Sequence, residues 1–468
     1  MRRPRDEESF KEYNYVSKIF KDEKLISQIP GNLPKVALIF PNDYEVASSS
    51  LAWSWIEQLL ANRGIGVERF FYEPWFKRFY SIEEQRPIDE FSTWLFTFQF
   101  ENDLRNIADL LIKRGVPLNA SDREDYHPLI IIGGPVNLFN VEMLSDIADL
   151  LFVGDLECAI DQFSQALMND NKFESIKEML KIPQIYSKVH GKENFKNCQG
   201  TLDIVPFSHF TTPHSVFKNK VLVEIGRGCI RRCAFCVTGY TKKPVKFASA
   251  ESVIEIFQKY RTEEFGLISA TITDYPYLNT LLDHMERENI RFSVSSMRVD
   301  DVNERLLRML RMTDHKSFTV APEGISQRIR EVMLKDITQE GIINGLTLGR
   351  NVGFEHVKLY YIIGFSEETS EDYREFFWFI DEVNKMGYRR ITLSINPLVP
   401  KPKTPFEYRK MIDRKDYEER IKYIKRNLQD KAKIYAEGYK ESLMQYQISR
   451  LRGIETIEFI KEHFMENN

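Results

Sequence analysis

The sequence predicts an α/β protein with an N-terminal doubly wound, Rossmann-like sheet, a partial (β/α)6 barrel of the TIM type, and a small α-rich C-terminal region. Two observations predict this fold. Short apolar runs alternate with helical stretches between about residues 35 and 155, and the alternation returns between 221 and 400. Such runs are typical of parallel strands buried on both faces. The length of 468 residues suits two or three domains.

Composition excludes two classes of protein. Hydrophobic residues make up 43% and charged residues 29%, so the chain is not disordered throughout. The net charge of −4 excludes binding of nucleic acid through bulk positive charge. No apolar run approaches the ~20 residues of a membrane span, and the charged N-terminus has no apolar signal core. We therefore expect a cytoplasmic protein without a membrane span.

The first α/β series is assigned to residues 33–170, after a helical or poorly ordered arm at 1–32. A helical stretch covers Leu51–Asn62, and a turn signal stands at Gly133–Pro135. The expected strands are Lys35–Phe40, Val67–Tyr72, Trp94–Phe98, Leu129–Ile132 and Leu150–Val153.

Residues 171–218 contain scattered prolines and are predicted to be a linker, and the second series occupies 219–408. Helical stretches at Ala250–Thr262 and Asp301–Met312 separate some of its strands. The expected strands are Val221–Ile225, Leu267–Thr271, Arg291–Ser295, Ser317–Ala321, His356–Ile363 and Arg390–Ile395. Six units in ~180 residues fit a partial barrel, whose chemistry lies at the carboxyl ends of the strands. The region 409–468 is predicted to be helical, with a short strand at Lys433–Ala436.

The cysteines are the most informative residues. Five is an odd number, and a cytosolic chain keeps its thiols reduced, so Cys158 and Cys198 are interpreted as buried or incidental thiols. Cys229, Cys233 and Cys236 form a C-x3-C-x2-C motif directly after a predicted strand. Three thiolates on one loop can bind three irons of an iron–sulfur cube, which leaves the fourth iron open to a small molecule. The alternatives are a structural zinc site with a distant ligand such as His214, and three buried thiols.

The motif, with the aromatic Phe235 before its last cysteine and a barrel strand before it, resembles that of the radical S-adenosylmethionine superfamily. The resemblance implies that Cys229, Cys233 and Cys236 hold a [4Fe–4S] cluster whose open iron chelates S-adenosylmethionine. An electron from a donor such as ferredoxin or flavodoxin then cleaves the cofactor, and the resulting 5′-deoxyadenosyl radical abstracts hydrogen from the substrate.

The same resemblance implies contacts for the adenine and the ribose. The segment YYIIGFSEE matches a G-x-I-x-G-x-x-E pattern through Ile362, Gly364 and Glu367, although Tyr360 replaces the first glycine. Gly364 would allow the backbone to approach the purine; the alternative is an ordinary strand-to-helix turn.

The segment APEGISQR resembles a PE-x-x-S-x-R motif, in which Glu323 and Ser326 would contact ribose or carboxylate. Here the alternative is capping of a helix N-terminus.

Two further positions are assigned to the methionyl group. Arg298 would clamp its carboxylate; the alternative is a surface salt bridge with Asp300 or Asp301. The Gly-Gly-Glu that binds the amine in the superfamily is absent, and the segment SATITDYP stands in its place. Thr271, Thr273 or Asp274 would substitute for it.

A closer resemblance covers about residues 33–410, through segments such as TDYPYL, SMRVDD and PLVPKPKTPFEY. It is to radical enzymes with an N-terminal cobalamin-binding-type domain. The D-x-H-x-x-G signature is missing and no histidine precedes Tyr126, so an axial histidine from this domain is not expected. Ser48–Ser50 and Gly133–Pro135 are where a nucleotide tail would lie, or ordinary turns. Cobalamin binding stays open.

The resulting hypothesis is a radical enzyme acting on an unknown small molecule, RNA or protein. The reaction is cobalamin-dependent methyl transfer, sulfur insertion or C–H functionalisation without cobalamin; the lack of a second cysteine set weighs against methylthio transfer. The alternatives are a non-catalytic iron–sulfur protein and a zinc-stabilised RNA-binding protein. Residues 409–433 carry ten basic and five acidic residues, which fits either an RNA contact or a solvated amphipathic helix.

Overall fold

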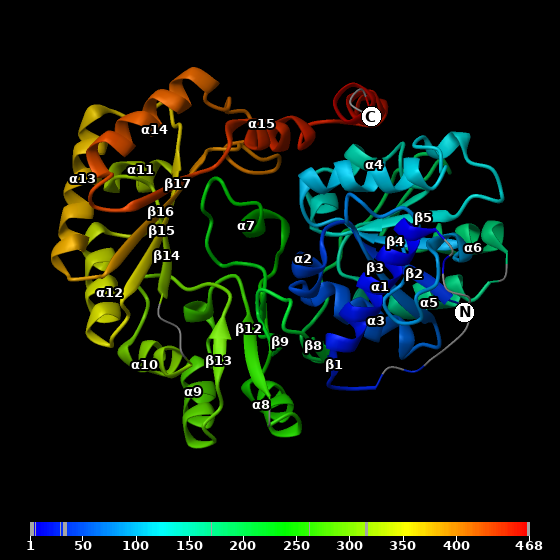
Figure 1. Cartoon of the computed structure of the whole chain (residues 1–468), viewed down its shortest axis with the longest axis horizontal. Coiled ribbons are helices and arrows are strands. Elements are labelled where there is room, and N and C mark those ends of the chain that lie inside the picture. Colours follow the sequence, from blue (N-terminus) through cyan, green and yellow to red (C-terminus); the bar gives the residue numbers. More distant parts are fainter. Residues whose placement is uncertain are drawn as a thin grey trace. The chain divides into compact units, whose positions relative to one another are not determined.

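The computed structural model describes residues 4, 6–28, 30, 35–169, 171–261, 263–313 and 317–465. The chain is a mixed α/β protein and divides into two compact units (Figure 1). The first comprises Met1–Thr201, Pro206–Val223 and Ile448–Asn468, and the second comprises Leu202–Val205 and Glu224–Gln447.

The first unit is built on a six-stranded sheet of order β3-β2-β4-β5-β6-β7. The five strands from β3 to β6 are parallel, and β7 is antiparallel to β6. The strands are β2 (Lys35–Phe40), β3 (Gly66–Phe71), β4 (Thr93–Thr97), β5 (Leu129–Gly133), β6 (Leu150–Phe152) and β7 (Ile185–Tyr186). Chain order reverses at β2, whose neighbours are the next two strands in sequence, so the carboxyl ends of β2 and β4 flank a switch point.

Helices accompany this sheet where the sequence carries one apolar face. In α4, the buried side chains Leu104, Ile107, Ala108 and Leu111 recur at helical spacing. The helices are α1 (Glu7–Asp22), α2 (Tyr44–Ser48), α3 (Leu51–Ala61), α4 (Leu104–Lys113), α5 (Ile160–Leu167) and α6 (Lys172–Met179).

The predicted arm and linker are integral parts of the first unit. The arm forms α1 and β1 (Lys24–Leu25), which pairs antiparallel with β8 (Phe210–Thr211). The predicted linker 171–218 contains α6, β7 and β8. Strands of two residues have no readable periodicity, so the sequence did not show them.

The interpretation of Cys158 and Cys198 as thiols is wrong for this structure, in which they form a disulfide. A backbone bridge between Gly154 and Cys198 brings the former linker to the end of β6. The two cysteines are 40 residues apart in sequence, so only the tertiary fold reveals the pair.

The six strands expected for a partial barrel form two hydrogen-bonded groups. One group has the order β13-β12-β9 and the other is the parallel sheet β14-β15-β16-β17. The strands are β9 (Lys220–Glu224), β12 (Glu264–Ile268), β13 (Phe292–Val294), β14 (Ser317–Glu323), β15 (His356–Ile363), β16 (Arg390–Pro397) and β17 (Lys433–Ala436). The strand expected at Leu267–Thr271 thus lies three residues earlier.

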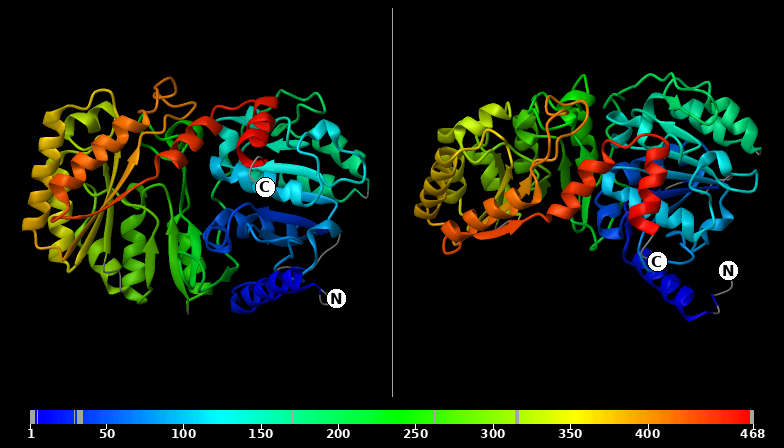
Figure 2. Two further views of the ribbon diagram at one scale, coloured as in Figure 1. Left: turned by 45° about the horizontal axis from the view of Figure 1, so that its top comes forward. Right: turned by 90° about the horizontal axis from the view of Figure 1, so that it is seen from above.

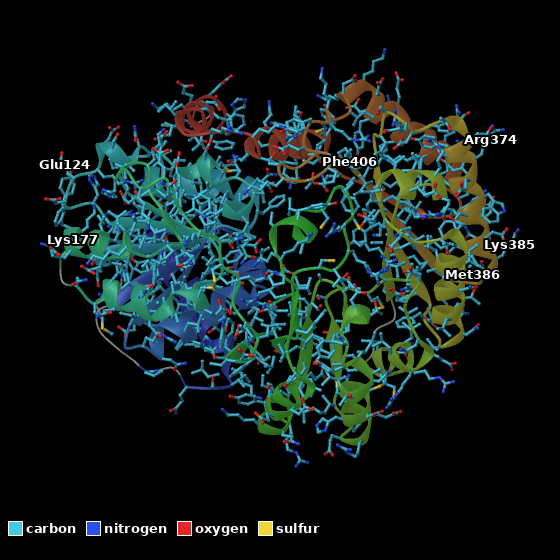
Figure 3. The ribbon with its side chains drawn as sticks, turned by 180° about the vertical axis from the view of Figure 1, so that it is seen from behind. Glu124, Lys177, Arg374, Lys385, Met386 and Phe406 are labelled. Atoms are coloured by element: carbon cyan, nitrogen blue, oxygen red, sulfur yellow. A yellow bond between two sulfur atoms is a disulfide. The ribbon has the colours of Figure 1, made fainter. Side chains whose placement is uncertain are left out.

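The sheet β14–β17 has one face against helices and one half-exposed face. Along β15, Val357, Leu359, Tyr361 and Ile363 are buried while the alternate residues are not, and α12 and α13 cover the outer side (Figures 1 and 2). The charged side chains Arg374 and Lys385 on α13 point away from the sheet (Figure 3). The helices are α8 (Ala250–Lys259), α9 (Leu278–Arg287), α10 (Glu304–Met312), α11 (Gln327–Val332), α12 (Gln339–Asn351), α13 (Ser370–Lys385) and α14 (Arg414–Leu428).

The predicted C-terminal region 409–468 is divided between the two units. The expected strand at Lys433–Ala436 is present as β17, paired with β16, and α15 (Tyr439–Ile448) follows it. The last helix, α16 (Ile454–Ile460), belongs to the first unit, where the Thr456 hydroxyl donates to the Met143 carbonyl at 2.7 Å. None of the helices in the described part of the chain is long and apolar enough to cross a membrane.

Candidate functional site

The three-cysteine motif lies on a loop with a narrow neck. After β9, the pair β10 (Gly226–Arg227) and β11 (Lys246–Phe247) closes the base of the loop. A Cβ on Gly226 would lie 2.8 Å from the Ser269 hydroxyl, and Gly228 has φ +86°. The short helix α7 (Thr238–Thr241) ends the loop. Glycine is therefore required both for the close approach and for the turn.

Cys229, Cys233 and Cys236 are free and half-buried. Burial raises the pKa of the Cys229 and Cys233 thiols, and the charge of Cys236 adds to both increases. The Lys335 ammonium opposes the increase in the pKa of Cys233. Three free cysteines on one short loop fit a [4Fe–4S] cluster, because each thiolate binds one iron.

A single metal ion requires a different arrangement. In the described part of the chain no three His, Cys, Asp or Glu side chains are grouped closely enough to hold one ion. The three ligands of a cube stand further apart, since each binds its own iron. His214, the distant zinc ligand considered from the sequence, lies in the first unit, and its Nε2 is 2.8 Å from Asp22 Oδ2.

The cysteine loop is attached to the turn between α11 and α12. The amide of Ala234 donates to the Met333 carbonyl at 2.8 Å. Within the loop, the Tyr240 hydroxyl donates to the Arg232 carbonyl at 2.6 Å. Phe235, the predicted adenine contact, is half-buried between two of the cysteines.

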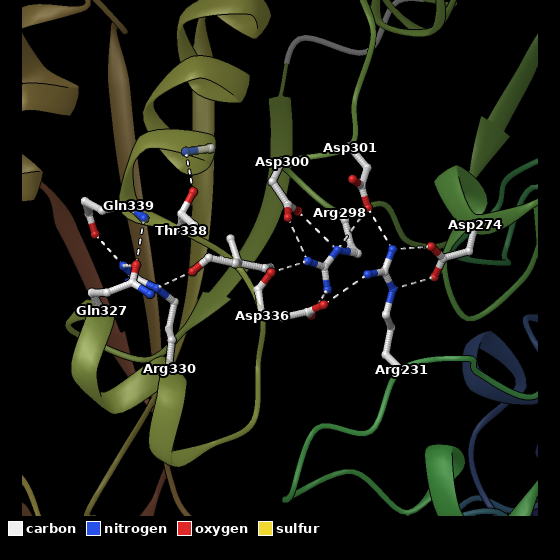
Figure 4. Close-up of polar contacts among 12 residues, drawn as sticks. Arg231, Asp274, Arg298, Asp300, Asp301, Gln327, Arg330, Asp336, Thr338 and Gln339 are labelled. Carbon is white, nitrogen blue, oxygen red and sulfur yellow. Dashed lines mark hydrogen bonds and ion pairs between the residues drawn. The ribbon is translucent and has the colours of Figure 1, made fainter.

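Arg231, between the first two cysteines, forms the densest polar contacts of the loop (Figure 4). Its Nη2 and Nε lie 2.6 and 3.2 Å from the two oxygens of Asp274. Nη2 is also 2.9 Å from Asp301, and Nη1 is 3.3 Å from Asp336. Sequence reasoning missed this residue, although its place inside the motif was a usable signal.

Arg298 lies beside Arg231 and shares partners with it. Its Nη2 and Nε lie 2.7 and 3.1 Å from the two oxygens of Asp300, and its Nη1 lies 3.0 Å from Asp336 Oδ1. Nη2 also donates to the Asp336 carbonyl at 2.9 Å. The alternative considered from the sequence, an ion pair with Asp300 or Asp301, is what the structure contains, although Arg298 is buried rather than on the surface.

The segment that replaces Gly-Gly-Glu follows β12 and includes the turn η7 (Ile272–Asp274). Both oxygens of Asp274 are engaged by Arg231. The Thr273 hydroxyl is buried and has no hydrogen-bond partner among the described residues. Among the predicted substitutes, Asp274 is thus occupied by Arg231, whereas Thr273 has a free polar atom.

Glu323 and Ser326 stand at the end of β14 and the start of α11. Glu323 has φ +66°, and its carboxylate is 3.5 Å from the Lys335 ammonium. Burial raises the pKa of Glu323, and Lys335 opposes that increase. The buried Ser326 hydroxyl caps α11 by accepting from the Ile329 amide and donates to Asp372 at 2.6 Å. The capping alternative therefore describes Ser326, whereas Glu323 makes a contact towards the cysteine loop.

Ile362 lies near the end of β15, and Gly364, which has φ +101°, begins the turn that follows. Glu367, which matched the superfamily pattern, makes a bidentate ion pair with Arg409 at 2.8 and 2.7 Å. Its neighbour Glu368, which the sequence analysis missed, is fully buried and accepts from the amides of Gly364 and Phe365 at 2.7 and 3.1 Å. The Gly364 amide is therefore occupied by the protein's own carboxylate.

In the first unit, the predicted nucleotide positions lie at the carboxyl edge of the sheet. Ser50 accepts from the Gln99 amide at 2.6 Å, and a Cβ on Gly134 would overlap the backbone of Phe98. At the same edge the Asn42 amide donates to Asp103 at 2.7 Å. Burial raises the pKa of Asp103 to about 7, so this edge holds a carboxyl group that titrates near neutrality.

A cavity of about 1080 Å³ opens at the opposite, amino edge of this sheet. Its walls include Trp94 on β4, His127 before β5 and Lys172 on α6. His127, the first histidine of the chain, thus lies at the wrong edge to ligate a group at the carboxyl ends of the strands.

Two family models match the chain. Residues 223–380 match the radical SAM superfamily, and residues 69–187 match the N-terminal region of radical SAM proteins. Because both models describe radical SAM proteins, these matches place the chain in the radical SAM superfamily. It is a radical SAM enzyme, of a class that uses a [4Fe–4S] cluster and S-adenosylmethionine.

Relatives extend the similarity over most of the chain. An uncharacterized protein of Methanocaldococcus jannaschii is 29% identical over 408 residues, covering 85% of this chain and 84% of its own length. The ribosomal protein uS12 methylthiotransferase RimO of Chlamydia caviae is 23% identical over 182 residues, covering 35% of this chain and 40% of that protein.

Among solved structures, the cobalamin-dependent S-adenosylmethionine radical enzyme OxsB with aqua-cobalamin bound has a TM-score of 0.54 and 13% identity. The match covers 90% of this chain and 63% of OxsB. The chain therefore spans less than half of that methylthiotransferase and under two thirds of OxsB, and the likeness to OxsB concerns the fold.

Proposed function

We propose that this enzyme cleaves S-adenosylmethionine reductively to a 5′-deoxyadenosyl radical for C–H functionalisation, with cobalamin-dependent methyl transfer as the reaction. When bound, the cluster would supply the electron that breaks the carbon–sulfur bond. The observation that carries the proposal is the short loop that holds three free, half-buried cysteines. Cys229, Cys233 and Cys236 would be its ligands.

The residues around the loop have distinct proposed roles. Phe235, Ile362 and Gly364 would line the adenine, with the Gly364 amide already held by Glu368. Glu323 would orient the ribose, with Ser326 acting through the helix cap behind it. The free hydroxyl of Thr273 would receive the methionyl amine. A sheltered barrel face would keep water and oxygen from the radical.

Cobalamin would lie against the first unit. Counting β2 as the first strand, the parallel strands have the order 2-1-3-4-5, a doubly wound arrangement that binds ligands at the carboxyl edge near its switch point. Ser48–Ser50 and Gly133–Pro135 lie at this edge. The similarity to the fold of OxsB supports the same reading. We propose binding without an axial histidine from this unit.

The electron donor and the cellular location are proposed on the same basis. A ferredoxin or flavodoxin would deliver the electron, and the protein would work in the cytoplasm. The substrate class remains a small molecule, RNA or protein.

An RNA- or protein-modifying radical enzyme without cobalamin is the second candidate, favoured by similarity to methylthiotransferases. The basic segment offers it little support, because α14 buries Ile421, Ile424 and Leu428 as an amphipathic helix does.

The test is anaerobic reconstitution of the full chain with iron and sulfide. We expect about four irons per chain, a cluster signal by electron paramagnetic resonance after reduction, and release of 5′-deoxyadenosine from S-adenosylmethionine. The variant Cys233→Ala should lose the signal and the product, whereas Cys158→Ser should keep both. Full iron binding by Cys233→Ala would refute the cluster assignment.

A second measurement tests cobalamin. Hydroxocobalamin added during anaerobic purification should remain with the protein through gel filtration and show a corrin absorption band. Replacement of Gly134 by Val, which would push into Phe98 at the carboxyl edge, should abolish retention while the cluster signal persists. A wild-type protein that retains no corrinoid but forms 5′-deoxyadenosine would support the second candidate instead.

A further inference from the structure

We propose that Arg231 is a positioning residue that clamps the cysteine loop to the ends of β12 and β13 and to the turn between α11 and α12, and thereby sets the separation of the thiolates. The proposal rests on the assignment of Cys229, Cys233 and Cys236 as cluster ligands. It also assigns Asp274 and Arg298 to this clamp instead of to the methionyl group.

The contacts of Arg231 reach three separate segments of the second unit. Asp274 follows β12, Asp301 follows β13, and Asp336 lies between α11 and α12. The pair with Asp274 is bidentate, an arrangement that fixes the orientation of a guanidinium as well as its position. A residue two positions from Cys229 and two from Cys233 is thus tied to three parts of the barrel.

Arg298 forms a second layer that holds the acceptors in place. It binds Asp300 through two nitrogens and Asp336 through its carboxylate and its carbonyl. Asp336 therefore bridges the two guanidinium groups (Figure 4). Burial raises the pKa of Asp336, but the charge and hydrogen bond of Arg298 outweigh it and the pKa is lowered. The bridge is thus ionised at neutral pH.

Two backbone features attach the same loop to the same place. The Ala234 amide donates to the Met333 carbonyl, three residues before Asp336. A Cβ on Gly239 would overlap the Arg231 carbonyl, so the short helix α7 packs directly against the backbone of Arg231. The guanidinium contacts and the backbone contacts therefore constrain the loop from both sides of Cys233.

The clamp also explains why Asp274 and Arg298 are poor candidates for cofactor contacts. Both oxygens of Asp274 accept from Arg231, and all three guanidinium nitrogens of Arg298 donate to aspartates. Binding the methionyl amine or carboxylate would require these buried ion pairs to break. An ordinary surface ion pair would leave one member exposed. Here the side chains of Asp274 and Arg298 are both mostly buried.

The experiment compares Arg231→Ala and Arg231→Lys with the matched control Arg232→Ala. Arg232 is the adjacent exposed arginine, outside the proposed clamp. Three quantities are measured: the alkylation rate of each cysteine in metal-free protein, the iron bound after anaerobic reconstitution, and the electron paramagnetic resonance spectrum of the reduced cluster. Circular dichroism and thermal melting establish that each variant is folded.

We expect Arg231→Ala to alkylate at Cys229 and Cys233 about three- to tenfold faster than wild type, as for a locally opened loop. It should bind under half the iron of wild type and give a broadened, heterogeneous spectrum. Arg231→Lys should recover part of the iron but not the bidentate geometry, and Arg232→Ala should match wild type. Wild-type alkylation rates, iron content and spectrum in Arg231→Ala would overturn the clamp.

Two provisions keep the outcome interpretable. If Arg231→Ala does not fold, Asp274→Asn, which removes one charge and keeps the shape, should show the same faster alkylation and lower iron content; wild-type values there would reject the proposal. If wild-type protein binds no iron, the proposed function fails, while the alkylation rates of the metal-free variants still decide whether Arg231 holds the loop.

Discussion

At the residue scale, the neighbouring carboxylates Glu367 and Glu368 show how a motif match can select the less buried of two residues. Glu367 fits the superfamily pattern but makes a partly exposed ion pair with Arg409. Glu368 is fully buried, accepts from two backbone amides of the turn and from the Tyr373 hydroxyl, and pairs with Arg420. The turn that would approach the adenine is therefore shaped by Glu368.

We predict that Glu368→Ala destabilises the second unit by about 3 kcal/mol, because it removes the buried partner of an ion pair and leaves the turn amides unpaired. Glu367→Ala should cost at most about 1 kcal/mol, as partly exposed ion pairs do. Urea unfolding followed by tryptophan fluorescence and circular dichroism measures both. An equal decrease in the free energy of unfolding in the two variants would contradict the larger structural role assigned to Glu368.

The Glu367–Arg409 pair also predicts a dependence on pH. The hydrogen bond from Arg409 lowers the pKa of Glu367 to about 2, below its ordinary value of 4.5. A carboxylate with a lowered pKa in the folded state stabilises fully above its unfolded value and loses that contribution as the pH falls towards about 2. The protection of the 400–410 loop amides against hydrogen exchange, corrected for the pH dependence of the intrinsic rate, should therefore decrease below pH 4.5 in wild type. In Glu367→Gln this protection should already be low at pH 6 and change less with acid.

At the scale of elements, close packing of helices depends on glycines that the periodic pattern does not distinguish. In α12, a Cβ on Gly345 would overlap the carbonyl of Val299, so the helix can lie against the segment after β13 only without a side chain there. The same segment carries Arg298 and Asp300. The packing of α12 against this segment therefore helps to hold the residues of the clamp in place.

We predict that Gly345→Ala destabilises the protein by about 2–3 kcal/mol, since overpacking outweighs the helix propensity gained by alanine. Gly438→Ala is the matched control, because its Cβ meets no atom within 4 Å and should change stability by under about 0.5 kcal/mol. Thermal melting compares the two. A melting temperature for Gly345→Ala equal to or above wild type would show that α12 can move away without cost.

At the scale of the whole molecule, two long-range connections complete the first unit. The Cys158–Cys198 disulfide attaches residues near 198 to the region after β6. The C-terminal segment returns to the same unit, where the Asn140 amide donates to the Ser449 and Leu451 carbonyls at 3.0 and 2.9 Å. The first unit is therefore complete only when the end of the chain is in place.

We predict that the double variant Cys158→Ser/Cys198→Ser lowers the stability of the first unit by about 2–4 kcal/mol, the usual effect of closing a loop of this length. Iron binding by the other three cysteines should not change. Melting with and without reductant provides the measurement: reductant should lower the wild-type transition and leave the double variant unaffected. Titration of unfolded, non-reduced wild type should count three free thiols, and five would contradict the disulfide.

Local patterns predicted much of this molecule. Apolar runs located β2 and β15 at their observed bounds and most other strands within one or two residues. The spacing of three cysteines after a strand predicts a cluster site, and this stays a prediction; it needs no information from elsewhere in the chain because the ligands lie on one short loop. Ser326 was predicted to contact ribose or carboxylate, with capping of a helix as the alternative, and the structure contains the cap.

Only the tertiary structure decided the rest. The partners of Arg231, the preference for Glu368 over Glu367, the disulfide and the return of α16 to the first unit all join residues far apart in sequence or depend on burial. Periodicity reports which residues face inward but not which inward-facing groups meet. The sequence by itself thus determined the chemistry carried by the cysteine loop, and the packing of distant segments decided how that loop is held.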